Sequence, residues 1–398
     1  MQAYVLDWLN LLARWLHFVA GISWIGASFY FVWLDNHLKP PAKADDSADG
    51  VSGELWAVHG GGFYHNQKFL TGPKNESLSR DLHWFKWEAY TTWLSGMALL
   101  GIVYWAGAGT YLIDRSVLDL SPAAAIGISI ASLVAGWIVY DTLCKLLGER
   151  PVVLGATVYA LLVAAAWGLF HVFGARAAFM HVGAIVGTIM VANVLFVIIP
   201  GQRKMVDAIR AGNAPDPLPG RLGKMRSVHN TYFTLPVLFI MISGHYPMTY
   251  DGANGWLVLA FISAAAVLVR HFFILSHKGR IAPALPAIAI LVLLGVAVAL
   301  APHERTAAAA ATVTFAQVQP IVAQRCAVCH AATPTQPGIT AAPLGVLLDS
   351  PQEIQRNAQR INAQAVASQA MPIGNVTGMT QAERTLLGEW IAGGAKLP

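Results

Sequence analysis

Cys326, Cys329 and His330 follow one another as Cys-x-x-Cys-His within "QRCAVCHAA", residues 324–332. This spacing is typical of c-type haem attachment: the two thiols add to the porphyrin vinyl groups, and the adjacent histidine is then placed to ligate the iron. A redox dithiol or half of a zinc site are the alternatives. No second cysteine pair follows that would complete a zinc site. The motif therefore predicts one covalent haem c.

A second axial ligand is expected in the same tail, where methionine opposite histidine raises the reduction potential. Met371 lies in "SQAMPIGNVTGMT", 41 residues after His330, and precedes a proline. This resembles the axial-methionine loop of small cytochromes. Met379 lies just before a helix start, where Thr380 and Glu383 have capping-box spacing. We therefore predict Met371 as the ligand and Met379 as a packing residue.

The rest of the chain has the composition of a membrane protein. Of its 398 residues 56% are hydrophobic and only 12% are charged, whereas soluble domains are about a quarter charged. A bilayer-spanning helix needs roughly 20 apolar residues. Such runs predict eight spans at about 5–34, 87–107, 122–143, 151–173, 177–199, 231–248, 254–275 and 282–301.

The basic residues predict the orientation of these spans. The loops after the first, third, fifth and seventh runs hold sixteen lysines and arginines, whereas the loops after the second, fourth and sixth hold only Arg115 and Arg176. Cytoplasmic loops are the basic ones. Both termini and the haem motif are therefore expected outside, in the periplasm of a bacterial inner membrane. This distribution explains the net charge of +5, so no nucleic-acid partner is predicted.

The predicted fold is all-α: a polytopic membrane helix bundle over 1–302, a linker over 303–312 and a small all-α cytochrome c domain over 313–398, which has helical stretches near 314–326 and 380–393. Cys144 is the only other cysteine, so no disulfide framework is expected.

Ionisable side chains inside the apolar runs are candidates for function. His17, His181 and His245 lie in the outer half of the predicted bundle. They suit either a bis-histidine b haem that relays electrons to the tail, or hydrogen bonding between helices. Arg270 suits either anion binding or snorkelling to the interface.

The segment from about 36 to 86 is long for a connection. It contains "ELWAVHGGGFYHNQKF" (54–69), followed by "LHWFKWEAYTTW" (82–93). Gly60, Gly61 and Gly62 allow a backbone to approach a ligand closely. The surrounding aromatic, histidine and lysine side chains suit either a flat anionic heterocycle or a segment lying along the membrane interface.

These motifs, together with "DWLNLLARWLHFVAGISWIGASFYFVWLDN" near the start and "NTYFTLPVLFIMISGHYP" before the seventh run, resemble the membrane-bound urate hydroxylases of bacterial purine degradation. The resemblance covers nearly the whole chain, including the order of its domains. It implies oxidation of urate to 5-hydroxyisourate, with electrons passing to the chain's own haem and then to a soluble or membrane cytochrome c or a terminal oxidase.

A urate site needs a base, a cation and stacking rings. His59 and His65 are the candidate bases, because histidine titrates near neutrality. Lys68 or Arg270 is expected to neutralise the substrate, and Phe63, Tyr64 or Trp84 to stack on it.

Three alternatives to urate oxidation stay open. The chain suits a membrane dehydrogenase for another small molecule, a quinol oxidoreductase, or a non-catalytic membrane-anchored cytochrome that only carries electrons. If the substrate loop is cytoplasmic and the haem is outside, about 30 Å of bilayer separates them. Either a b haem then bridges the gap, or the loop folds back into the bundle, or urate binds on the outer side.

Overall fold

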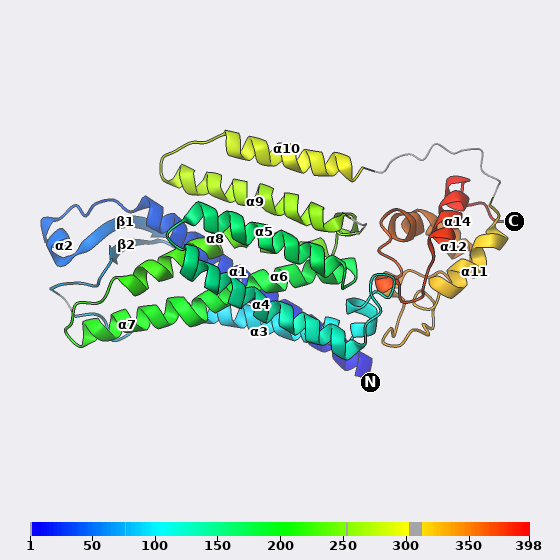
Figure 1. Cartoon of the computed structure of the whole chain (residues 1–398), viewed down its shortest axis with the longest axis horizontal. Coiled ribbons are helices and arrows are strands. Elements are labelled where there is room, and N and C mark those ends of the chain that lie inside the picture. Colours follow the sequence, from blue (N-terminus) through cyan, green and yellow to red (C-terminus); the bar gives the residue numbers. More distant parts are fainter. Residues whose placement is uncertain (1, 76, 252–253, 302–312) are drawn as a thin grey trace.

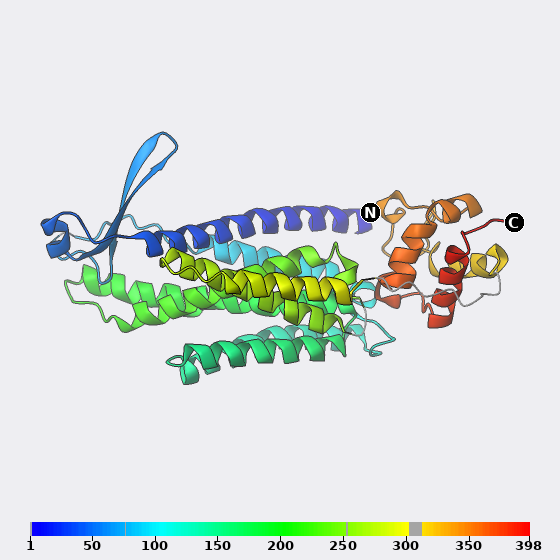
Figure 2. The same cartoon turned by 90° about the horizontal axis from the view of Figure 1, so that it is seen from above.

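The computed structural model describes residues 2–75, 77–251, 254–301 and 313–398, so the predicted linker 303–312 lies outside the described residues. A long helix bundle is followed by a smaller C-terminal domain at one of its ends (Figure 1). The start of the first helix lies at this same end, and a β-hairpin lies at the opposite end (Figures 1 and 2). We call the end next to the C-terminal domain the outer end and the other the hairpin end.

Each of the eight predicted apolar runs coincides with a helical segment of the bundle. Among the described residues, five helical stretches are long and apolar enough to cross a membrane, and α10 is a shorter apolar helix. The chain is therefore compatible with a membrane protein. The elements of the bundle are α1 (Gln2–His37), α3 (Trp87–Leu99), η1 (Leu100–Trp105), η2 (Ala108–Leu112), α4 (Pro122–Leu147), α5 (Pro151–Phe170), α6 (Ala175–Ala192), η3 (Asn193–Ile198), α7 (Ile199–Arg210), α8 (Leu218–Ser243), η4 (Pro247–Thr249), α9 (Gly255–His277) and α10 (Ala284–Ala299).

Helix α6 lies at the centre of the bundle. It packs against α3, α4, α5, α8 and α9, and most of its side chains are buried. By contrast, α1 packs mainly on α3, and α10 packs on α9 and buries only Ala289. The outward faces of α1 and α10 are exposed and apolar, as lipid-facing helices require.

The residues after the fifth run depart from the prediction. A basic loop was expected over about 200–230, but α7 and the first half of α8 are helical there. Pro219 occupies the first turn of α8, where a missing N–H costs nothing. The connection between the two helices is therefore short, and basic residues such as Arg226 lie on a helix instead of in a loop.

The all-α prediction needs one correction. Two antiparallel strands, β1 (Val51–His59) and β2 (Gly62–Phe69), form a hairpin after the short helix α2 (Ala44–Asp49). His59 pairs with Gly62, which leaves Gly60 and Gly61 as a two-residue turn. Both have positive φ, 60° and 82°, as such tight hairpin turns demand. The tight turn of the hairpin thus explains why glycines occur at this place, without a ligand that the backbone has to approach.

The C-terminal domain has its own hydrophobic core, which includes Phe315, Val318, Leu387 and Trp390. The two predicted helical stretches are present, and the predicted capping box at Thr380 is formed in both directions. The elements are α11 (Phe315–Arg325), η5 (Pro343–Gly345), α12 (Pro351–Arg356), α13 (Ala358–Ile361), η6 (Asn362–Ala367), η7 (Ile373–Asn375) and α14 (Gln381–Ala392).

Candidate functional site

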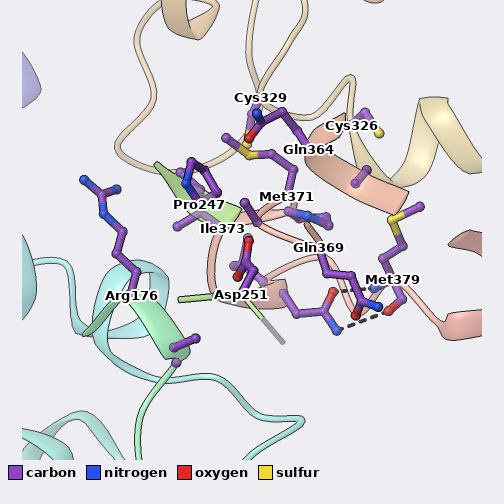
Figure 3. Close-up of a pocket in the computed structure, with 18 of the residues that line it drawn as sticks. Arg176, Pro247, Asp251, Cys326, Cys329, Gln364, Gln369, Met371, Ile373 and Met379 are labelled. Carbon is purple, nitrogen blue, oxygen red and sulfur yellow. Dashed lines mark hydrogen bonds between the residues drawn. The ribbon is translucent and has the colours of Figure 1, made fainter. Parts of the chain in front are cut away.

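A cavity of about 1320 Å³ lies between the outer end of the bundle and the C-terminal domain. We call it the outer cavity. Its bundle wall comes from the connections at the outer end and from the start of α6, and its other wall comes from the Cys-x-x-Cys-His segment and the loop that carries Met371 (Figure 3). Pockets for single small ligands usually measure about 300–1,000 Å³. The outer cavity is therefore large enough for more than one small group.

The end of α11 positions the cysteine motif. The chain turns at Cys326, whose carbonyl accepts hydrogen bonds from the amides of Cys329 (3.1 Å) and His330 (3.0 Å). All three residues line the cavity, and both thiols are free. Burial raises the pKa of Cys326 to about 11 and also raises that of Cys329, so both stay protonated.

His330 is oriented as a metal ligand should be. Its Nδ1 lies 3.0 Å from the carbonyl oxygen of Val346, so an Nδ1–H donor leaves Nε2 free. The backbone carbonyl of His330 also accepts a hydrogen bond from the amide of Leu348 at 2.7 Å. The same segment of chain therefore contacts both the ring and the backbone of His330.

Met371 and Met379 both line the outer cavity. Met371 is half-buried, and its carbonyl accepts a hydrogen bond from Arg384 at 2.7 Å. Met379 is only 3% exposed and belongs to the core of the C-terminal domain. Met371 also packs against the edge of that core, so an axial ligand at Met371 and a packing residue at Met379 stay predictions.

The donor set fits a covalently bound haem: two thiols, an imidazole nitrogen and a thioether line one large cavity. Among the described residues, no group of three or more histidine, cysteine, aspartate or glutamate side chains gathers as a metal site. Haem iron with one histidine and one methionine does not require such a group.

The bundle wall of the cavity carries a cation at a helix start. Gly174 caps α6 without a side-chain hydrogen bond, and it lines the cavity together with Ala175, Arg176 and Ala177. The N–H groups of a first helical turn have no acceptor within the helix, and they attract anions. The Nε of Arg176 is buried and lacks a hydrogen-bond partner among the described residues.

Asp251 lines the same cavity. Its Oδ2 is buried and, within the described chain, has no hydrogen-bond partner. Burial raises the pKa of Asp251 to about 7, opposed by the charge of Arg384 and reinforced by Asp114. Figure 3 shows Asp251 between Arg176 on the bundle side and Met371 on the other.

The C-terminal domain is in direct contact with the bundle through Gly374 of η7. A Cβ at this position would lie 2.6 Å from the carbonyl oxygen of Thr110 and 3.0 Å from that of Ile113. Gly374 also has a φ of 56°. The loop that carries Met371 therefore approaches the bundle as closely as only glycine permits.

The hairpin places the predicted catalytic residues in a different environment. His59 is exposed, Phe63 is 78% exposed and Tyr64 is 54% exposed. A Cβ added at Gly60 or Gly61 would meet no atom within 4 Å, and one at Gly62 would meet only the His59 carbonyl oxygen, at 3.9 Å. The hairpin projects away from the bundle (Figure 2).

His65 and Lys68 have structural partners on this hairpin. His65 stacks on Trp56 with ring centroids 4.3 Å apart and lies 2.9 Å from a carboxylate oxygen of Glu54. Lys68 pairs at 2.5 Å with Asp35 of α1, which also binds Lys224 of α8. Catalytic roles for His59, His65 and Lys68 stay predictions.

Trp84 and Arg270, the other predicted substrate residues, lie apart from the hairpin tip. Trp84 packs in a small cluster that includes Ala89 and Val194. Arg270 is 5% exposed and lies 4.6 Å over the ring of Phe29. The burial of Arg270 argues against snorkelling of its side chain. The residues predicted to bind the substrate lie in separate environments and do not form one site.

The three candidate ligands of a b haem are also separated. His17 contacts α3 through Thr92 and Ser95, whereas both ring nitrogens of His181 lie 2.7 Å from protein oxygens, those of Ser129 and Ala177. His245 lines the outer cavity. A bis-histidine haem stays a prediction, and these hydrogen bonds favour the alternative interpretation for His17 and His181.

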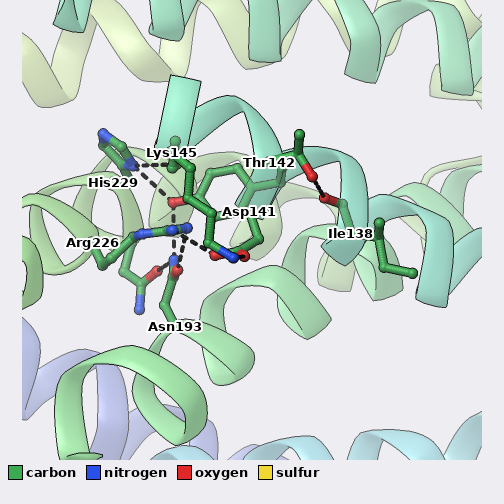
Figure 4. A network of polar contacts seen from close by, with 10 residues as sticks. Ile138, Asp141, Thr142, Lys145, Asn193, Arg226 and His229 are labelled. Atoms are coloured by element: carbon green, nitrogen blue, oxygen red, sulfur yellow. Dashed lines mark hydrogen bonds and ion pairs between the residues drawn. The ribbon is translucent and has the colours of Figure 1, made fainter. Parts of the chain in front are cut away.

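A buried polar cluster joins α4, η3 and α8, and the sequence did not indicate it (Figure 4). Arg226 donates to Asp141 at 2.6 Å and to Asn193 at 3.3 Å. Tyr140 bonds His229 at 2.7 Å and accepts from Asn193. None of these residues lines the outer cavity. The sequence analysis did not single out Arg226, because it placed this residue in a loop over about 200–230. A basic residue in a loop was used only as evidence for the orientation of the membrane spans.

Comparison with known proteins covers most of the bundle. Residues 3–301 match the family model described as urate oxidase N-terminal. No curated protein and no solved structure gave a significant match. The match indicates a urate-related function and an oxidoreductase. The chain belongs to the urate oxidase N-terminal family.

Proposed function

We propose that this protein oxidises urate to 5-hydroxyisourate and transfers the electrons to a haem c carried by its C-terminal domain. Cys326 and Cys329 attach the haem, and His330 and Met371 ligate its iron. The electrons then pass to a soluble or membrane cytochrome c or to a terminal oxidase. The domains are those predicted: the bundle over 1–302, the linker over 303–312 and the cytochrome domain over 313–398.

The observation that carries the proposal is the combination of a urate oxidase family match over the bundle with a Cys-x-x-Cys-His segment facing that bundle across one cavity. The family match supports urate as the substrate. The free Nε2 of His330 and the two thiols beside it support the haem.

The overall reaction balances with water as the oxygen source. Urate and one water give 5-hydroxyisourate, two protons and two electrons. When bound, haem accepts these electrons one at a time and passes them on. The chain has to bind the planar anion, accept its proton and admit one water at the ring carbon that is oxidised.

The membrane arrangement follows from the basic residues and from the shared location of the two chain ends. Both termini and the cytochrome domain are periplasmic, and the hairpin end is cytoplasmic. Membrane lipid surrounds the bundle, with α1 and α10 exposing apolar side chains to it.

An anaerobic reduction experiment tests the proposal. Purified oxidised protein is mixed with urate in the absence of oxygen, and the visible spectrum is followed. We expect the c-type haem bands to become those of the reduced form and 5-hydroxyisourate to appear at one molecule per two electrons delivered to an added acceptor. A colourless protein, or a haem that stays oxidised, would contradict the proposal.

A further inference from the structure

Two side chains of opposite charge, Arg176 and Asp251, line the bundle side of the outer cavity. Arg176 lines the cavity beside the first turn of α6, whose N–H groups have no acceptor within the helix, and a guanidinium next to such N–H groups suits an oxyanion. Asp251 also lines the cavity, and a carboxyl oxygen is an acceptor for an N–H donor. A ligand that satisfies both needs an anionic oxygen and a ring N–H on one small molecule.

Urate has this pattern, because its rings alternate carbonyl or oxyanion groups with N–H groups. Haem propionates are the other anions that the cavity would receive. A propionate satisfies Arg176, but its acceptor oxygens can bond Asp251 only while that carboxyl is protonated, whereas a ring N–H can bond either state of it. The two groups together therefore favour a cyclic imide or urea anion over a propionate.

The cavity volume supports a second occupant beside the haem. At about 1320 Å³ it exceeds the usual range for one small-molecule pocket. The cysteines and Met371 lie on one wall, and Arg176 and Gly174 lie on the other. Tyr111 and Phe170, which also line the cavity, provide aromatic surface for a planar ring.

We propose that urate binds in the outer cavity, with an oxyanion at Arg176 and the first turn of α6 and a ring N–H toward Asp251. This inference rests on the proposed function and names its substrate site. Substrate and haem then share one cavity, so electrons do not have to cross the thickness of the bundle. Urate enters from the outer end, and the hairpin at the other end takes no part in binding it.

Binding measured without turnover tests this site. The detergent-solubilised holoprotein is fully reduced beforehand, so that urate cannot pass electrons to it, and the Kd for urate is measured by anaerobic equilibrium dialysis. For Arg176→Gln we expect a Kd raised by roughly tenfold to a hundredfold, as the loss of charge-assisted hydrogen bonds implies. Arg176→Lys keeps the charge and restores part of the affinity, and Asp251→Asn raises the Kd by less than Arg176→Gln.

Arg115→Gln is the matched control. Arg115 lies at the same end of the bundle, pairs with Asp119 at 3.5 Å and has a largely exposed side chain that does not line the cavity. Arg115→Gln removes the same charge as Arg176→Gln, but away from the cavity. The Kd of this variant for urate is therefore expected to equal that of the wild type.

The outcomes separate this inference from the function. If the wild type reduces its haem with urate but Arg176→Gln binds urate normally, the site is wrong and the function stands. If Arg176→Gln alters the haem spectrum or reduction potential and leaves the urate Kd unchanged, Arg176 holds a propionate and the inference fails. If the wild type binds no urate at all, the proposed function itself fails.

Discussion

The two ends of the bundle carry similar side chains in different surroundings. The hairpin end has histidines, lysines and aromatic rings around a glycine turn, but His59 and Phe63 are exposed and His65 and Lys68 are already paired. At the outer end, Arg176 and Asp251 line a large cavity together with histidines and aromatic rings, and no hydrogen bond to either side chain is found within the described chain. Residue types alone do not make a site. Polar side chains that line an enclosed cavity do.

The largest effect is expected from removing both thiols of the cysteine motif. Cys326→Ala with Cys329→Ala should abolish covalent haem entirely, because no thioether can form. In-gel haem staining after denaturing electrophoresis measures this. Cys144→Ala, which changes a thiol buried in the bundle, should stain like the wild type. If the double variant still stained, the haem would not be attached at Cys326 and Cys329, and the outer cavity would not be the place where electrons are accepted.

Docking of the C-terminal domain is tested by Gly374→Ala. The new Cβ would meet the Thr110 carbonyl oxygen at 2.6 Å, so the domain must shift away from the bundle. We expect urate-dependent haem reduction in stopped flow to slow by roughly tenfold to a hundredfold, because a misplacement of about 1 Å can cost about a hundredfold in rate. The spectrum of the bound haem should not change.

Gly378→Ala is the control for Gly374→Ala. Gly378 has a φ of 66°, close to that of Gly374, but its added Cβ would meet only Arg325 at 4.0 Å. Both variants share the backbone strain, and only one has the steric clash. Equal rates in the two variants would show that contact at η7 does not matter for electron transfer.

The axial assignment is tested by potentiometry. Met371→Leu should lower the reduction potential by on the order of 100 mV or more, because a methionine ligand raises it. Met379→Leu should leave the potential near that of the wild type and cost less than about 1.5 kcal/mol of stability, as volume-conserving core changes do. A potential that falls with Met379→Leu alone would exchange the two roles.

Asp251 predicts a pH dependence of stability. Its pKa is near 3.8 when exposed and about 7 when buried, so between these values the folded protein holds a proton that the unfolded chain has lost. The stabilisation is therefore complete at low pH and disappears as pH rises toward 7. The apparent Tm, followed by tryptophan fluorescence, should fall by a few degrees from about pH 5 to about pH 8.

Asp251→Asn should flatten that profile, because the amide does not titrate. Asp114 and Arg384 are the charged groups that also act on the pKa of Asp251: Asp114 raises it and Arg384 lowers it. An unchanged profile in Asp251→Asn would assign the pH dependence to another group.

The smallest effect is expected at the hairpin. If the outer cavity binds urate, His59→Ala and His65→Ala should change kcat and KM by less than about twofold, because these side chains then touch neither substrate nor haem. Steady-state kinetics with ferricytochrome c as the acceptor measures this. If either variant lost turnover while its haem spectrum stayed intact, the hairpin would be the catalytic site and the outer cavity would not.

Much of the fold was predictable because hydrophobic runs and capping residues are local signals. Every predicted apolar run is helical, and Thr380 caps α14 as its spacing indicated. The hairpin was missed because the glycine triplet was interpreted as a ligand loop instead of a tight turn. The Arg226 cluster was missed because a basic residue beside a span resembles a topology signal until its partner Asp141 is known.

The amino-acid sequence by itself determined the apolar helices and the two longest helices of the C-terminal domain, since each depends on residues close together in the chain. It also predicted the haem chemistry of the cysteine motif. Only the tertiary structure decided which polar groups share a cavity. Arg176, Asp251 and Cys326 are far apart in sequence, and they line one cavity because the C-terminal domain docks on the outer end of the bundle. That contact depends on packing between distant segments, which no local pattern encodes.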